Sequence, residues 1–257
     1  MDQVTPVFVC GMGRSGTTNT VRILNAHPSV MLNGEIALSV LKPFFALLDA
    51  IDQSYGSNDQ LSEDWKARKA EYIFESFGYL SKSGRGRYDN ATGAFFRGHK
   101  TPRLEMIFEQ YESHFSSCGP APRYFFCARN PFDCWRSYRV MSWSAYQGMD
   151  DLLRDYLLSF ERLKKMRDEV GERVAVINLD ELKAAPDLFK YYAEKLFAPL
   201  GLDLPERSMK RVEKIIGDRK PTKAPALSEA DRNAIASKHG VAKILETYFP
   251  QSISTSH

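Results

Sequence analysis

Short segments that favour strands alternate with longer segments in which apolar residues recur every three or four positions. Strands are predicted at residues 6–10, 29–32, 94–100, 124–128 and 173–179, and the first and fourth of these are unbroken apolar runs. An apolar run of this length, bounded by glycine or polar residues, fits a strand that is buried on both faces. Helices are predicted at residues 17–26, 35–52, 63–80, 103–115, 131–138 and 152–170, and in most of the chain after Pro186.

This alternation predicts an α/β fold of three layers, with a mostly parallel central sheet of about four or five strands flanked by helices. The length of 257 residues suits one α/β domain, and we predict a single domain over residues 1–257. Residues 53–93 contain a polar turn, a helix and a basic loop with Arg85 and Arg87. We interpret them as an insertion that forms either a wall over a binding site near the strand ends or a solvated surface loop.

The formal net charge is +3, which suits a small anionic ligand but not a nucleic-acid-binding face. Four cysteines, Cys10, Cys118, Cys127 and Cys134, form no C-x-x-C pair, so we expect reduced thiols and a cytoplasmic protein. No export signal is apparent. The most apolar later stretch, 36–51, is interrupted by Lys42 and Pro43, so we expect no membrane span.

The stretch from Gly11 to Thr18 follows the first apolar run and leads into a helix, as in a phosphate-binding loop. Its glycines satisfy G-x-G-x-x-G, and Glu35 lies about 20 residues on, as the ribose-binding acid of a dinucleotide site does. The same stretch fits a Walker A pattern in which Thr17 replaces the lysine, and this argues against a triphosphatase. The loop alone therefore predicts an anion site.

The segment Gly11-Met12-Gly13-Arg14-Ser15-Gly16-Thr17-Thr18 resembles the 5′-phosphosulfate loop of the sulfotransferases that use 3′-phosphoadenosine 5′-phosphosulfate (PAPS). A second segment, Arg129-Asn130-Pro131-Phe132-Asp133-Cys134-Trp135-Arg136-Ser137-Tyr138, is similar to the 3′-phosphate motif of that family. The resemblance implies a P-loop-like fold, PAPS as donor, 3′-phosphoadenosine 5′-phosphate (PAP) as product, and no metal. The donor-binding residues that it implies are Gly13, Arg14, Ser15, Gly16, Thr17, Thr18, Arg129 and Ser137.

The resemblance also implies catalytic residues for attack by an acceptor hydroxyl. The run from His27 to Glu35 is similar to a run in tyrosylprotein sulfotransferases and related bacterial enzymes, in which the glutamate is the general base. His99 is the rival base, because cytosolic sulfotransferases use a histidine in a comparable segment. Lys100, in a Lys-x-Pro pattern, is the expected cation at the bridging oxygen, and Arg14 is a second cation.

Several alternatives stay open at this point. The acceptor is a small molecule, a carbohydrate or a peptide tyrosine, and the similarity around Glu35 slightly favours the last. The basic segment 219–223 closes over the 3′-phosphate or is a solvated loop. Two functions of other classes also fit the glycines: an NAD(P)-binding Rossmann oxidoreductase and a non-catalytic nucleotide-binding module.

Overall fold

The computed structural model describes residues 4–56, 59–81, 94–141, 146–218 and 224–253. Its centre is a five-stranded sheet in which every pair of neighbouring strands is parallel, in the order β2-β3-β1-β4-β5. The strands are β1 (Thr5–Cys10), β2 (Val30–Glu35), β3 (Phe96–Lys100), β4 (Arg123–Ala128) and β5 (Val174–Asn178). Both the strand number and the parallel arrangement confirm the predicted fold class.

Strand β1 lies in the middle of the sheet and is buried on both faces. Phe8 and Cys10 point into one hydrophobic core, whereas Val7 and Val9 point into the other, and none of these four side chains is exposed. Successive residues of a strand face opposite sides, so an unbroken apolar run is what a strand covered by two helical layers requires.

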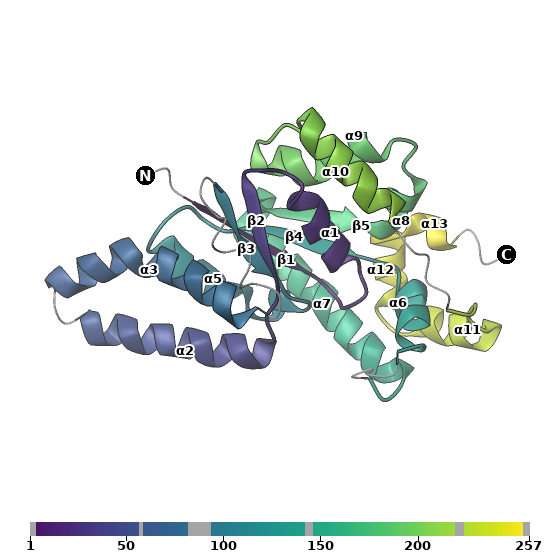
Figure 1. Ribbon diagram of the computed structural model, residues 1–257. Coiled ribbons are helices and arrows are strands. Elements are labelled where there is room, and N and C mark those ends of the chain that lie inside the picture. The colour runs from purple at the N-terminus through teal and green to yellow at the C-terminus, as the bar shows by residue number, and fades with distance from the viewer. Residues whose placement is uncertain (1–3, 57–58, 82–93, 142–145, 219–223, 254–257) are drawn as a thin grey trace.

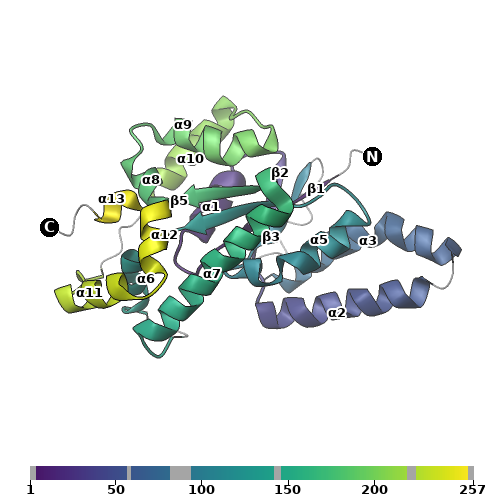
Figure 2. The same cartoon turned by 180° about the vertical axis from the view of Figure 1, so that it is seen from behind.

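Helices cover both faces of the sheet (Figures 1 and 2). The core on one face contains residues of α1 (Thr17–Leu24), α9 (Leu188–Tyr192) and α10 (Glu206–Gly217). The core on the other face contains residues of α2 (Leu38–Tyr55), α3 (Asp59–Leu80), α5 (Phe108–Ser116) and α7 (Met149–Val170). The other helices of the described residues are α6 (Pro131–Tyr138), α8 (Leu179–Ala184), α11 (Glu229–Ser237), α12 (Val241–Tyr248) and α13 (Pro250–Ile253). Short turns in the same ranges are η1 (Leu104–Ile107), η2 (Gly171–Arg173), η3 (Ala193–Phe197) and η4 (Ala198–Leu200).

Strand β2 is longer than the sequence predicts. The sequence predicts a helix from Glu35, directly after the Asn33-Gly34 pair, but the strand continues to Glu35 and α2 begins only at Leu38. Strand β3 supplies ladder partners for Asn33 and Glu35, with a β-bulge between them. Pairing with a neighbouring strand therefore overrides the local turn preference of Asn-Gly.

Helices α2 and α3 lie side by side and project from the sheet in both views (Figures 1 and 2). Helix α3 contains the predicted helix 63–80, and Asp52 of α2 accepts hydrogen bonds from Trp65 at 2.6 Å and Lys69 at 2.7 Å. The basic loop with Arg85 and Arg87 and the segment 219–223 lie outside the described residues. The interpretation of 53–93 as an insertion and the single domain stay predictions.

Within the described ranges, none of the helices combines the length and the apolar character that a membrane crossing needs.

Candidate active site at the carboxyl ends of the strands

The glycine loop connects β1 to α1 and needs glycine at two positions for clear reasons. Gly11 has φ +107° and Gly16 has φ +96°, a region that other residues rarely adopt. A Cβ atom on Gly11 would lie 2.4 Å from the carbonyl oxygen of Cys127, and one on Gly16 would lie 2.5 Å from Leu179 Cδ1. The loop therefore fits closely against β4 and against the start of α8.

The loop presents a row of free backbone donors. Within the described part of the chain, nothing accepts a hydrogen bond from the N–H groups of Arg14, Gly16, Thr17 or Thr18. The Ser15 hydroxyl, by contrast, donates to the Met12 carbonyl at 2.5 Å and is used within the loop. Free N–H groups at a helix start attract an anion, and the helix dipole acts in the same direction.

A buried carboxylate that the sequence did not single out holds the loop in place. The N–H of Gly11 donates to Glu105 Oε2 at 2.9 Å, and the Ser159 hydroxyl donates to the other carboxylate oxygen. Glu105 is completely buried, and this burial raises the pKa of its carboxyl. Glu105 is the third residue of the predicted helix 103–115, and nothing in the sequence around it indicated this contact.

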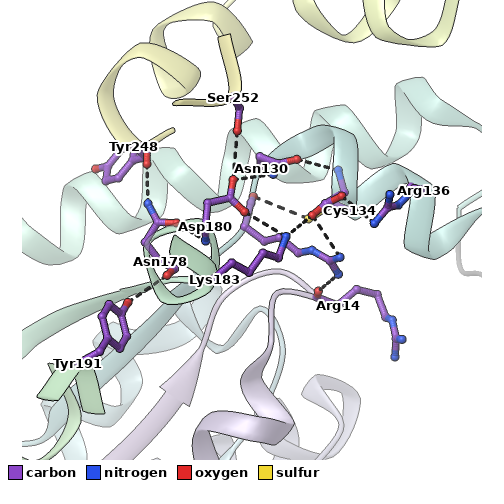
Figure 3. Close-up of polar contacts among 12 residues, drawn as sticks. Arg14, Asn130, Cys134, Arg136, Asn178, Asp180, Lys183, Tyr191, Tyr248 and Ser252 are labelled. Atoms are coloured by element: carbon purple, nitrogen blue, oxygen red, sulfur yellow. Dashed lines mark hydrogen bonds and ion pairs between the residues drawn. The ribbon is translucent and has the colours of Figure 1, made fainter. Parts of the chain in front are cut away.

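The loop and the second motif meet at Arg14. Arg14 Nε donates to the Ser137 hydroxyl at 3.0 Å. Arg129 donates to the Arg14 carbonyl oxygen at 2.8 Å, and Figure 3 draws this contact at Arg14. Arg129 follows the last residue of β4, and Ser137 lies on α6. Helix α6 begins as predicted, because the Asn130 side chain accepts a hydrogen bond from Asp133 N at 2.7 Å and Pro131 occupies the first turn.

Glu35 and Lys100 form an ion pair at the ends of β2 and β3. Lys100 Nζ lies 2.8 Å from Glu35 Oε2, and the two residues are register partners across the β-bulge. The Lys100 side chain is 12% exposed and that of Glu35 is 45% exposed, so the carboxylate is accessible to a ligand. Because all five strands are parallel, this pair lies at the same edge of the sheet as the glycine loop.

His99 is not part of this group. It precedes Lys100 in β3, so its side chain points to the opposite face of the sheet, where it packs against Phe8 and Tyr111. The ring is fully buried, with Nε2 2.8 Å from the Tyr111 hydroxyl and Nδ1 3.2 Å from the Thr101 hydroxyl. Burial lowers the pKa of His99 to about 3, so the ring is neutral at physiological pH.

The sequence profile of the sulfotransferase family matches residues 6–206, well over half of the chain and all of the site described above. The chain belongs to the sulfotransferase family. No curated protein sequence matches it significantly.

Three solved structures share the sulfotransferase fold at low sequence identity. A sulfotransferase domain from the olefin synthase of Synechococcus is 15% identical, with 96% of each chain covered and a TM-score of 0.55. A sulfotransferase from Mycobacterium avium is 16% identical over 97% of this chain and 78% of that one, with a TM-score of 0.53. A sulfotransferase domain from the curacin biosynthetic pathway is 13% identical over 96% of this chain and 98% of that one, with a TM-score of 0.53.

A cluster of charges that the sequence did not predict surrounds Asp133 in this sulfotransferase. Its carboxylate lies 3.5 Å from Arg129, 3.1 Å from Arg136 and 2.5 Å from Lys183 of α8. Burial raises the pKa of Asp133, but the hydrogen bond from Lys183 and the neighbouring positive charges outweigh it, so the pKa lies below its ordinary value. The carboxylate is therefore ionised at neutral pH.

Two other features of the described residues lie away from this edge of the sheet. An open cavity of about 650 Å³ is lined by Arg22, His27 and Lys214, beside Val30 at the amino end of β2. One group of possible metal ligands, Asp49, Asp52 and His114, lies where α2 packs on α5. Lys69 already neutralises Asp52 there at 2.7 Å, so the group has little need of a metal cation.

Proposed function

We propose that this sulfotransferase transfers a sulfuryl group from PAPS to an acceptor hydroxyl, with Glu35 as general base. The observation that carries the proposal is the meeting of the two motifs at Arg14, which bonds to Ser137 through its side chain and to Arg129 through its carbonyl group. Sequence positions more than a hundred residues apart thus form one anion-binding surface. The Glu35–Lys100 pair lies at the same edge of the sheet.

The residues present fit a nucleotide with phosphate at both ends. We propose that the free N–H groups of Gly16, Thr17 and Thr18, with Gly13 and Ser15 shaping the loop, hold the 5′-phosphate. Arg129 and Ser137 hold the 3′-phosphate. The fit of Arg129 is supported by its Nε, which is buried and has no acceptor among the described residues. A buried donor without a partner costs free energy that a bound phosphate oxygen offsets.

At the reacting end, the acceptor oxygen attacks sulfur in line with the leaving phosphate oxygen. Glu35 accepts the proton of the hydroxyl as the new oxygen–sulfur bond forms. The bond between sulfur and the bridging oxygen breaks, and its electron pair stays on the phosphate. Lys100 moves its ammonium group from Glu35 toward that oxygen and stabilises the developing charge, with Arg14 as the second cation.

His99 is not assigned the role of base. Its ring is enclosed by Tyr111 and Thr101 and lies on the opposite face of the sheet from Lys100, so no acceptor hydroxyl reaches it without unfolding of the core. The assignment of Glu35 is therefore supported by accessibility and by its contact with Lys100.

No metal enters the proposed reaction, because Lys100, Arg14 and the loop N–H groups supply the positive charge. An excess of chelator is expected to leave the rate unchanged. A strict requirement for magnesium would contradict the scheme.

One experiment tests the donor. Labelled sulfate is expected to move from PAPS to an alcohol in a panel of phenols, sugars and tyrosine peptides. In parallel, PAP is expected to raise the melting temperature, whereas NAD(P)H and ATP with magnesium are not, because only a ligand that binds the folded state stabilises it. Stabilisation by NAD(P)H alone would favour the oxidoreductase, and stabilisation by PAP without transfer to any alcohol would favour the non-catalytic module.

The class of acceptor and the cellular location stay predictions. A small-molecule, carbohydrate or peptide-tyrosine hydroxyl each fits an accessible Glu35. All four cysteines are free thiols, which agrees with the predicted cytoplasmic location.

A further inference from the structure

Three cationic side chains lie around the Asp133 carboxylate, beside the proposed 3′-phosphate site. Asp133 Oδ2 lies 2.5 Å from Lys183 Nζ and 3.5 Å from Arg129, and Oδ1 lies 3.1 Å from Arg136. Asp180, which Figure 3 shows near Lys183, is a second carboxylate of this cluster. Its Oδ1 lies 3.3 Å from Lys183 Nζ. Around Asp133 and Asp180, positive charges therefore outnumber negative ones.

Two of these cationic side chains have a hydrogen-bond donor without an acceptor. The Nε atoms of Arg129 and of Arg136 are buried and have no acceptor among the described residues. The Arg129 side chain is only 9% exposed, so water does not readily satisfy its Nε. A donor of this kind gains a hydrogen bond when an acceptor is added beside it. The cluster is therefore arranged for more negative charge than Asp133 alone provides.

Lys183 is the cation that is free to move. Its side chain is 53% exposed, whereas those of Arg129 and Asp133 are 9% and 15% exposed. Its helix is held firmly, because the Asn178 side chain caps α8 and Asp180 accepts hydrogen bonds from Asn130 at 2.6 Å and Ser252 at 3.1 Å (Figure 3). The backbone of Lys183 is fixed, and its long side chain can still change partner.

Asp133 also lies close to the proposed 3′-phosphate site. Asp133 and Ser137 are four residues apart on α6, so their side chains lie on the same face of the helix, one turn from each other. A phosphate bound to Ser137 and Arg129 therefore comes close to the Lys183 ammonium group.

We propose that Asp133 supplies the negative charge that Lys183 contacts in the protein without nucleotide, and that Lys183 moves from Asp133 to the 3′-phosphate when nucleotide binds. Lys183 is then a specificity-determining residue that selects nucleotides carrying a 3′-phosphate. The proposal rests on the proposed function. Arg136 and the Arg129 nitrogen that faces Asp133 keep this carboxylate neutralised. Arg129 Nε and the Lys183 ammonium group then face a phosphate monoester of nearly two negative charges.

The test compares two ligands, PAP and adenosine 5′-phosphate, by calorimetry on the full chain. Lys183→Ala is expected to lower the affinity for PAP about tenfold and to leave that for adenosine 5′-phosphate within about twofold, because one charge-assisted contact to the 3′-phosphate is lost. Lys183→Arg is expected to restore most of the preference for PAP. The control is Lys190→Ala, which removes the same charge from a side chain that is 72% exposed on α9.

Two results overturn the proposal. One is an unchanged affinity of Lys183→Ala for PAP, and the other is an equal loss for both ligands. If Arg129→Ala still weakens PAP binding in either case, the proposed function stands and only the role of Lys183 falls. If the wild-type protein shows no preference for PAP over adenosine 5′-phosphate, the PAPS donor itself is wrong.

Discussion

Arg14 Nε donates a hydrogen bond to the Ser137 hydroxyl at 3.0 Å, although 123 positions separate the two residues in the chain. The sequence assigned Arg14 to the sulfate end of the donor and Ser137 to the 3′-phosphate. In the folded protein the two lie together, and Arg129 bonds to the carbonyl group of the same Arg14. The glycine loop and the helix α6 motif are therefore one surface, and a change in either is expected to affect the whole nucleotide.

Arg129→Ala is expected to weaken PAP binding by tenfold or more, because a buried guanidinium forms strong charge-assisted contacts with phosphate. Arg129→Lys keeps the charge but loses the planar donors, so it is expected to recover only part of the affinity. Calorimetry measures both. Arg154→Ala, at a side chain that is 73% exposed on α7, is the matched control. Equal affinity in Arg129→Ala and in this control would remove Arg129 from the site.

Glu35→Gln is expected to keep PAP affinity within about twofold and to lower turnover by about 10²–10⁴, the usual contribution of a general base. Glutamine has nearly the same shape but does not accept the proton. Single-turnover transfer from PAPS measures the chemical step, and Glu75→Gln on an exposed face of α3 is the control. An active Glu35→Gln enzyme would remove the base role from Glu35.

His99→Gln tests the rival base, and its effect on the free energy of unfolding is expected to depend on pH. The pKa of His99 is lowered to about 3 in the folded state, from an ordinary value of 6.5. Below pH 6.5 the unfolded chain therefore binds a proton that the folded chain does not, and stability falls as the pH falls toward 3, by up to about 1.4 kcal/mol per pH unit.

In His99→Gln this part of the acid sensitivity is expected to disappear, so denaturant unfolding between pH 4 and 6 shows a shallower slope than in wild type. At pH 7.5 the variant is expected to be less stable, because the contacts with Tyr111 and Thr101 change, yet to keep turnover within about tenfold. A folded His99→Gln protein without turnover, beside an active Glu35→Gln protein, would make His99 the base.

The sequence was most informative where one local rule dominates. The apolar run of β1 and the helix that begins at Pro131 each follow from the needs of a few neighbouring residues, and each was predicted correctly. The predicted end of β2 was wrong, because the preference of Asn33-Gly34 for a turn is weaker than the pairing of this segment with β3. Local propensity does not include the partner strand.

Contacts between side chains that are far apart in the sequence could not be predicted from the sequence. Glu105 and Lys183 appear as ordinary polar residues of helices, and only the packing of η1 and α8 brings them to Gly11 and Asp133. The relation of His99 to Lys100 was within reach, since neighbours in a strand face opposite sides. The alternation alone shows that the two cannot share one site, but not which face holds the donor.

Gly13→Ala tests how closely α6 packs on the glycine loop. A Cβ atom at Gly13 would lie 2.1 Å from the Tyr138 hydroxyl oxygen and 3.3 Å from the ring carbon that carries it. The φ of Gly13 is not in the left-handed region, so alanine fits the backbone and only the hydroxyl stands in the way. The overpacked variant is expected to lose about 1–3 kcal/mol of stability and to bind PAP more weakly.

Tyr138→Phe removes the obstructing oxygen, so the double variant Gly13→Ala with Tyr138→Phe is expected to regain most of the PAP affinity that Gly13→Ala loses. Gly119→Ala is the control, because a Cβ atom there meets nothing within 4 Å. A double-mutant cycle from calorimetry and thermal unfolding gives the coupling between the two positions. Additive effects would show that Tyr138 does not press on the loop, and that Gly13 is needed for another reason.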